Sequence, residues 1–183
     1  TGTSHGGVVL PDGSIATVKL DLDALKALSE AASKQYQMGG AVQHGASTLP
    51  EEAFVSFPRF GACEIHLATN FQNMVFDHPK LPADIREGYK QWVIQNCASE
   101  RKAGDSEQQF IYKSRKKAIG PFKRQMWDMP RAVLDAIGAD LEKTFGMLFD
   151  RLNIGGTAEV VARYVKAPVL RQSAPQPVAA AAP

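Results

Sequence analysis

The stretch between residues 21 and 76 alternates between helical and extended patterns, which limits the fold more than any other feature of the sequence. Apolar residues at three- and four-residue spacing predict a helix over 21–36, and short apolar runs at 41–43 and 61–67 predict two strands, with a further helix opening at Thr69. The apolar face of the first helix comprises Leu22, Leu25, Leu28, Ala32 and Tyr36. Helices that alternate with strands over short connections are typical of a parallel sheet. We therefore predict an α/β fold in which this helix face packs on the sheet.

Small residues form the two turns that lead from the predicted strands into helices. Gly45-Ala-Ser47 follows the first strand, and Thr48-Leu-Pro-Glu51 has the spacing of a capping box that starts a short helix. A similar turn ends the second strand at Thr69. Backbone N–H groups and hydroxyls at two helix N-termini suit a phosphate group. Ordinary helix capping by these hydroxyls is the alternative interpretation.

Histidines stand at or near the predicted strand ends. His44 ends the first strand, and His5 has the same setting of small polar residues before and a glycine after. Neutral imidazole is a common zinc ligand, but a catalytic zinc site uses three protein ligands, so a structural role for this pair is the alternative. His66 shares one side of the second strand with Glu64, because side chains alternate along a strand; it either faces the site or lies in the core. His78 is predicted to be a helix-end or loop residue.

Three amphipathic stretches predict long helices in the second half of the chain, and a short helix follows them. Their ranges are 82–102, 109–119 and 130–152, with the short helix ending near Val165. Residues 6–20 contain the turn signal Pro11-Asp-Gly13 and are predicted to be a loop. The last residues, 167–183, are rich in Pro and Ala and nearly uncharged, which predicts disorder. We expect a division into residues 1–103, 104–166 and 167–183.

Charge is distributed unevenly along a chain whose net charge is only +2. Between Arg101 and Arg131 nine basic residues face three acidic ones. Such a segment suits phosphate-bearing ligands or nucleic acid, whereas a solvated charged helix face is the alternative. No apolar run approaches the roughly 20 residues that span a bilayer, so we expect a soluble, cytoplasmic protein. Cys63 and Cys97 lack the spacing of a disulfide framework or a cysteine zinc site and are predicted to be buried free thiols.

Three motifs, taken together and in order, resemble the last three strand ends of class II, metal-dependent fructose-bisphosphate aldolases. They are Thr1-Gly-Thr-Ser-His-Gly-Gly7, Val42-Gln-His-Gly-Ala-Ser-Thr-Leu-Pro-Glu-Glu52 and Glu64-Ile-His-Leu-Ala-Thr69. The resemblance is good to about Asn96, looser to about Asn153 and absent in the tail. It implies a TIM barrel, of which this chain supplies the C-terminal portion, about strands six to eight with their helices and a C-terminal helical extension.

The resemblance also implies roles for individual residues. His5 and His44 match two zinc-binding histidines of the family, with another divalent ion and a monovalent cation as further possibilities for the metal. The residues that match the family's phosphate-binding positions are Gly6, Gly45, Ser47 and Thr69. His66 replaces an asparagine that touches the reacting ketose, and it is a candidate substrate contact. Ala46 replaces a glycine, and Ala68 occurs in the tagatose-type enzymes.

The activity implied by the resemblance is reversible cleavage of a ketose 1,6-bisphosphate, most simply fructose 1,6-bisphosphate, to dihydroxyacetone phosphate and glyceraldehyde 3-phosphate. The catalytic aspartate and the third zinc histidine belong to earlier strands in the family, and these 183 residues hold no candidate for either. Because Thr1 opens the chain inside a motif, we expect a fragment or processed chain. We expect it to be inactive without the N-terminal half of the barrel, supplied by a longer parent or a second chain, and to form homo-oligomers.

Three other hypotheses compete with the leading one. A tagatose-bisphosphate aldolase differs only in the configuration of one substrate carbon. A non-catalytic structural or regulatory relative of the aldolase barrel is suggested by the substitutions Ala46 and His66. Nucleic-acid binding through residues 101–131 is disfavoured, because the segment has few interleaved aromatic residues.

Overall fold

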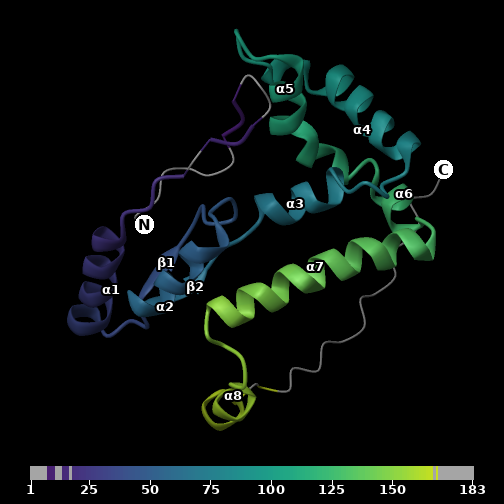
Figure 1. The fold of residues 1–183 in the computed structure, drawn as a ribbon. Coiled ribbons are helices and arrows are strands. Elements are labelled where there is room, and N and C mark those ends of the chain that lie inside the picture. Colours follow the sequence, from purple (N-terminus) through teal and green to yellow (C-terminus); the bar gives the residue numbers. More distant parts are fainter. Residues whose placement is uncertain (1–7, 11–13, 17, 167, 169–183) are drawn as a thin grey trace, which may run out of the picture. The chain divides into compact units, whose positions relative to one another are not determined.

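Two short strands pair in parallel and carry the residues of the candidate site. In the computed structural model, which describes residues 8–10, 14–16, 18–166 and 168, β1 (Ala41–Gln43) lies beside β2 (Ala62–Ile65) (Figure 1). The His66 N–H donates to the Gln43 carbonyl oxygen at 2.8 Å, which extends the pairing to the strand ends. The predicted strands and their parallel pairing are confirmed, and the fold is α/β and mostly helical.

The helices around the strands follow the predicted order. α1 (Leu22–Tyr36) begins where the Asp21 carboxylate accepts a hydrogen bond from the Ala24 N–H at 2.9 Å. Two short helices, η1 (Glu51–Val55) and α2 (Ser56–Arg59), connect β1 to β2, and α3 (Thr69–Phe76) follows β2. The predicted capping box is wrong: the first helix after β1 begins at Glu51 with Pro50 as its cap, so the Thr48 hydroxyl lies too early to cap it.

The second half of the first unit is built from helices, which lie at the predicted places except for the short helix at residues 123–127, which was not predicted. They are α4 (Ala83–Asn96), η2 (Ala98–Glu100), α5 (Glu107–Ser114), η3 (Arg115–Ile119), α6 (Lys123–Trp127) and α7 (Arg131–Arg151). α5 starts at a capping box in which Ser106 and Gln109 exchange hydrogen bonds, a signal that the sequence analysis missed. A break after Ser114 divides the predicted helix 109–119 between α5 and η3.

The chain divides into two compact units, and the boundary along the sequence follows Asn153. Within the second unit the described part contains α8 (Ala158–Tyr164), close to the predicted short helix. Among the described residues, no helix is both long and apolar enough to cross a membrane. The predicted disordered tail, apart from residue 168, lies outside the described residues.

Two hydrophobic clusters stabilise the first unit. The helical cluster is built on Phe76, Leu81, Ile85, Tyr89, Val93, Cys97, Phe110, Ala118, Met129 and Ile137. The sheet cluster is built on Leu25, Ala41, Ala46, Phe54, Phe57 and Leu148. Both receive residues from α7, because Ile137 belongs to the first cluster and Leu148 to the second. α7 therefore connects the helical half of the unit to the strands.

Several apolar residues of the predicted core are exposed on the sheet side. Leu25 of α1 is fully buried, but Leu28 and Tyr36 of the same predicted face are 47% and 71% exposed. Cys63 on β2 is exposed, which corrects the prediction that both thiols are buried; Cys97 in the helical cluster is buried as predicted. The two strands are too short to cover the whole face of α1, which explains the difference.

Candidate functional site

Two histidines meet where the parallel strands end. His44 follows β1 directly and His66 follows β2, and the carboxyl ends of neighbouring parallel strands lie at the same edge of a sheet. Their ring centroids are 4.3 Å apart, with 35° between the ring planes. Both residues are exposed. The edge therefore carries two exposed imidazoles side by side.

Glu64 holds the imidazole of His66. Nε2 of His66 and Oε1 of Glu64 are hydrogen-bonded, and both side chains are about half exposed. This contact confirms the prediction that they share one side of the second strand. His66 is therefore an oriented surface histidine and not a core residue, which decides between the two interpretations left open by the sequence.

The turns after the two strands contain the predicted phosphate-binding residues. Gly45 has a φ of 72°, a left-handed conformation that glycine adopts without the steric cost of a side chain. Ala46 behind it is fully buried in the sheet cluster, and Ser47 is half-buried. Thr69 is the first residue of α3, whose first turn has no side-chain cap. These turns follow neighbouring strands, so their backbone N–H groups belong to the same edge as the two histidines.

Two predicted site residues, His5 and Gly6, lie outside the described residues. Within the described ranges, no cluster of three or more His, Cys, Asp or Glu side chains is arranged to hold a metal ion. His44 still has the chemistry of a zinc ligand, since it is an exposed imidazole at a strand end. A complete ligand set then needs His5 and a further residue.

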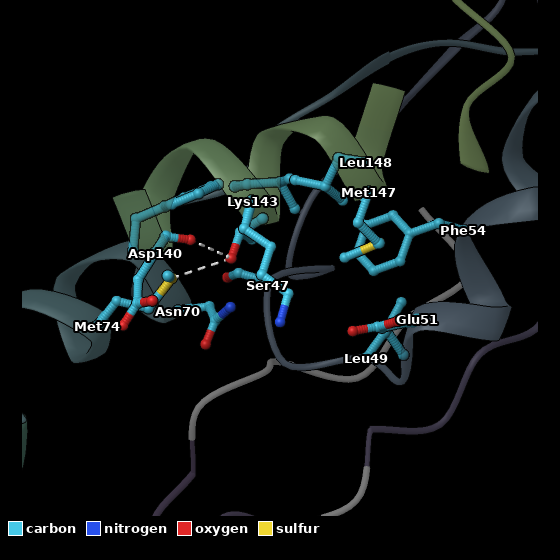
Figure 2. Close-up of a pocket in the computed structure, with 13 residues that line it drawn as sticks. Ser47, Leu49, Glu51, Phe54, Asn70, Met74, Asp140, Lys143, Met147 and Leu148 are labelled. Atoms are coloured by element: carbon cyan, nitrogen blue, oxygen red, sulfur yellow. Dashed lines mark hydrogen bonds between the residues drawn. The ribbon is translucent and has the colours of Figure 1, made fainter. Parts of the chain in front are cut away.

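A pocket of about 430 Å³ opens beside the turn that follows β1. It is bordered by this turn, the start of α3 and the second half of α7 (Figure 2). Its residues are Ser47, Leu49, Glu51, Phe54, Leu67, Asn70, Phe71, Met74, Asp140, Lys143, Thr144, Met147 and Leu148. Ser47 is thus both a predicted phosphate-binding residue and part of the pocket wall.

His78 is buried and fixes α7 against the end of α3. Its Nδ1 accepts a hydrogen bond from the Lys80 N–H at 3.1 Å, so Nε2 carries the proton in the neutral ring. Nε2 lies 3.3 Å from Oδ2 of Asp140 on α7. His78 was predicted to be a helix-end or loop residue, and it lies in the loop just after the C-cap of α3, where it attaches α7 near the pocket.

Much of the charge in the basic segment is already paired within the chain. The pairs are Lys113 with Asp105, Arg115 with Asp77, Lys117 with Glu100, Arg124 with Asp128 and Arg131 with Asp135. Hydrogen bonding by Glu100 raises the pKa of Lys117. The arrangement favours the interpretation as a solvated, self-paired helix surface over a site for phosphate or nucleic acid.

No protein-family model matches this chain, and no curated protein or solved structure does so either. The function is therefore inferred from the chain's own residues and their arrangement.

Sequence reasoning found the histidines and both turns but missed the pocket wall supplied by α7. Lys143 and Asp140 lie about 100 residues after β1, and nothing local in the sequence indicates that α7 returns to the turn after this strand. The spacing of Asp140, Thr144 and Met147 on one helix face is the only signal, and the same spacing occurs in ordinary amphipathic helices.

Proposed function

We propose that this chain is the zinc- and phosphate-binding part of a class II aldolase, and that its α/β region is the C-terminal portion of a TIM barrel. The observation that carries the proposal is the meeting of His44 and His66 at the carboxyl edge of two adjacent parallel strands, each followed by a small-residue turn. In a TIM barrel the carboxyl ends of the strands carry the active site, with phosphate held after the last two strands.

The proposed metal ligands are His5 and His44, completed by a histidine from an earlier strand. Zinc, when bound, supplies a Lewis acid that withdraws electron density from the ketose carbonyl. His44 suits this role, because its exposed imidazole directly follows β1 at the carboxyl edge of the strands.

The chain's own residues bind and orient the substrate. Gly45, Ser47 and Thr69, with Gly6, hold the C1 phosphate through backbone N–H groups and hydroxyls, and this fixes the ketose relative to the metal. His66 contacts a substrate hydroxyl through Nδ1, and the hydrogen bond between its Nε2 and Glu64 orients the ring for this contact.

Cleavage requires a catalytic aspartate, which we assign to the N-terminal half of the barrel. We accordingly propose that the isolated chain is inactive, and that activity needs this half as a second chain or in a longer parent. The proposed setting is a cytoplasmic homo-oligomer acting on fructose 1,6-bisphosphate, with the tagatose isomer as the alternative substrate.

The first test is native mass spectrometry of the full chain, titrated with zinc and with dihydroxyacetone phosphate. We expect about one zinc per chain, and an affinity that falls at least about tenfold in His44→Ala because an imidazole ligand is lost. Cys63→Ser is the matched control, since Cys63 is an exposed thiol on β2 that lies beside Gly39 and Gly40, at the opposite end of the strands from His44. Equal zinc binding by the wild type and His44→Ala would rule out the proposed ligand.

One observation favours a second function, that of a non-catalytic relative of the barrel. His66 stands where the aldolases have asparagine, and one of its ring nitrogens is already hydrogen-bonded to Glu64. His66→Asn separates the two hypotheses. If the chain is an aldolase, His66→Asn is expected to increase the affinity for dihydroxyacetone phosphate, because the family's usual contact is restored. If it is a non-catalytic relative, neither the wild type nor the variant binds this ligand.

A further inference from the structure

The pocket beside the turn after β1 contains a cation that the aldolase resemblance does not assign. Lys143 extends from α7, and Figure 2 shows its side chain running toward the turn at Ser47 and ending between Asn70 and Glu51. No hydrogen bond or ion pair of Lys143 occurs within the described part of the chain. The ammonium group is therefore available to a ligand in the pocket.

The polar groups near Lys143 are those that bind phosphate in other proteins. Ser47 supplies a hydroxyl and Asn70 a side-chain amide, and Asn70 belongs to the first turn of α3, where the helix dipole favours a negative charge. An ammonium group beside a hydroxyl and an amide suits a phosphate dianion, which offers three acceptor oxygens.

Two carboxylates also border the pocket, and their positions limit where an anion binds. Asp140 is directed to buried His78, with its Oδ2 3.3 Å from Nε2, so the imidazole N–H interacts with this carboxylate oxygen. Glu51 lies on the other side of Lys143 from Asn70 in the close-up view (Figure 2). An anion is consequently favoured at the Ser47–Asn70 end of the pocket and repelled at the Glu51 end.

The remaining wall is apolar and belongs to the sheet cluster. Phe54 and Leu148 are almost fully buried, and Leu67, Phe71 and Met147 pack against them. This wall fixes the part of α7 that carries Lys143, because Leu148 lies little more than one turn further along the helix. Lys143 is thus held over the turn by core packing and not by chance placement of a surface helix.

From this arrangement we infer that Lys143 is a phosphate-binding residue, which α7 brings to the phosphate of a sugar phosphate held at Ser47 and Asn70. The inference rests on the proposed function, because Ser47 belongs to the proposed phosphate cradle. It adds a residue from the C-terminal extension to that cradle. It also makes α7 part of the ligand site, so that phosphate binding links the extension to the strands.

The test measures binding of dihydroxyacetone phosphate and of inorganic phosphate to the zinc-loaded full chain by isothermal titration calorimetry. We expect Lys143→Met to weaken both affinities about tenfold, the effect of losing one charge-assisted contact. Lys143→Arg keeps the charge and is expected to stay within about threefold of the wild type. Lys26→Met is the matched control, because Lys26 is an exposed lysine on α1 outside the pocket.

The outcomes separate this inference from the proposed function. Binding that is weakened by Lys143→Met and retained by Lys143→Arg and Lys26→Met supports the inference, and equal weakening for the two ligands assigns the contact to the phosphate group alone. If Lys143→Met binds both ligands as tightly as the wild type, the inference about Lys143 is overturned, but the proposed phosphate-binding residues of the turns are not. A zinc-loaded wild type that binds neither ligand overturns the cradle and the inference together. Far-ultraviolet circular dichroism of each variant verifies that α7 is intact.

Discussion

The helical cluster and the sheet cluster differ in how completely they cover the apolar faces of α4 and α1, the helices that pack into them. Val93 and Phe110 of the helical cluster are at most 2% exposed, and the charged residues around them are paired. On the sheet side, Leu28 and Tyr36 of α1 are largely exposed, and so is the β2 thiol of Cys63. The groups able to bind a metal or an anion lie in the less covered region. The comparison indicates that the helical half supplies stability and the sheet half supplies the ligand site.

Phe110→Ala is expected to have the largest effect on stability. The ring is 2% exposed in the helical cluster, so its removal leaves a cavity and lowers the free energy of unfolding by about 3–5 kcal/mol. Urea denaturation followed by circular dichroism measures the change. Phe149→Ala on α7 is the matched control, because this ring is 49% exposed and its loss costs below about 1 kcal/mol. Similar losses for the two variants would contradict the proposed difference between covered and uncovered regions.

A pair of leucines on α1 tests the same comparison within a single helix. Leu25 is fully buried in the sheet cluster, and Leu25→Ala is expected to cost about 3 kcal/mol. Leu28 is 47% exposed, so Leu28→Ala is expected to cost below about 1 kcal/mol. Thermal unfolding of both variants at one protein concentration gives the two values. A loss at Leu28 equal to that at Leu25 would mean that this face of α1 is covered in solution by another chain.

Arg115 attaches α5 and η3 to α3, and its loss is expected to have a smaller effect. Its guanidinium donates to Asp77 at 2.5 and 2.8 Å and to the Asn73 side chain at 2.7 Å, and it lies 4.6 Å from the Tyr112 ring centroid. Burial lowers the pKa of Arg115, but the hydrogen bond and charge of Asp77 outweigh burial, so the pKa is raised and the side chain remains charged.

Arg115→Met is expected to lower the free energy of unfolding by about 2 kcal/mol. This loss is smaller than that for a fully buried ion pair, because the Asp77 side chain is 58% exposed and water can solvate it in the variant. Arg124→Met is the matched control. Arg124 is 87% exposed and paired with Asp128 within α6 and its C-terminal cap, so its loss costs below about 0.5 kcal/mol. Guanidinium titration at constant ionic strength compares the two variants, and equal losses would show that the Arg115 contacts contribute nothing beyond a surface pair.

The covered and exposed faces also differ in how well the sequence predicts them. The alternation of periods predicted both strands, their parallel pairing and the helices, because these patterns are local. Local patterns do not reveal which residues the rest of the chain covers, and therefore Leu28, Tyr36 and Cys63 were assigned to the interior. The capping box failed at Thr48 for a related reason, since its spacing matches the rule but the helix begins at Glu51.

The candidate site shows the same limit. The positions of His44 and His66 at two strand ends were predictable, and so was their common edge, because parallel strands place their carboxyl ends together. The position of Glu64 on the same side of the strand as His66 was also predicted, but the hydrogen bond between the two side chains was not. The contribution of Lys143 was not, because it depends on the path of α7 through space. Predicting the position of Lys143 in the pocket requires knowledge of contacts between distant segments, which a single sequence does not provide.

The smallest expected effect is the pH dependence contributed by Asp105 at the start of the basic segment. A hydrogen bond from Lys113, 2.6 Å from Oδ1, is the main cause that lowers the pKa of Asp105, with the Lys102 N–H contributing. Because the folded-state pKa is depressed, the stabilisation is fully present above the ordinary pKa and is lost as the pH falls through the lower folded value. Asp105→Asn removes it. The wild type is expected to be slightly more stable than the variant at pH 7, with a difference that shrinks below about pH 4. Melting temperatures of both chains measured across this range check the sign, and a difference that grows on acidification would mean that Asp105 is not held by Lys113 in the folded chain.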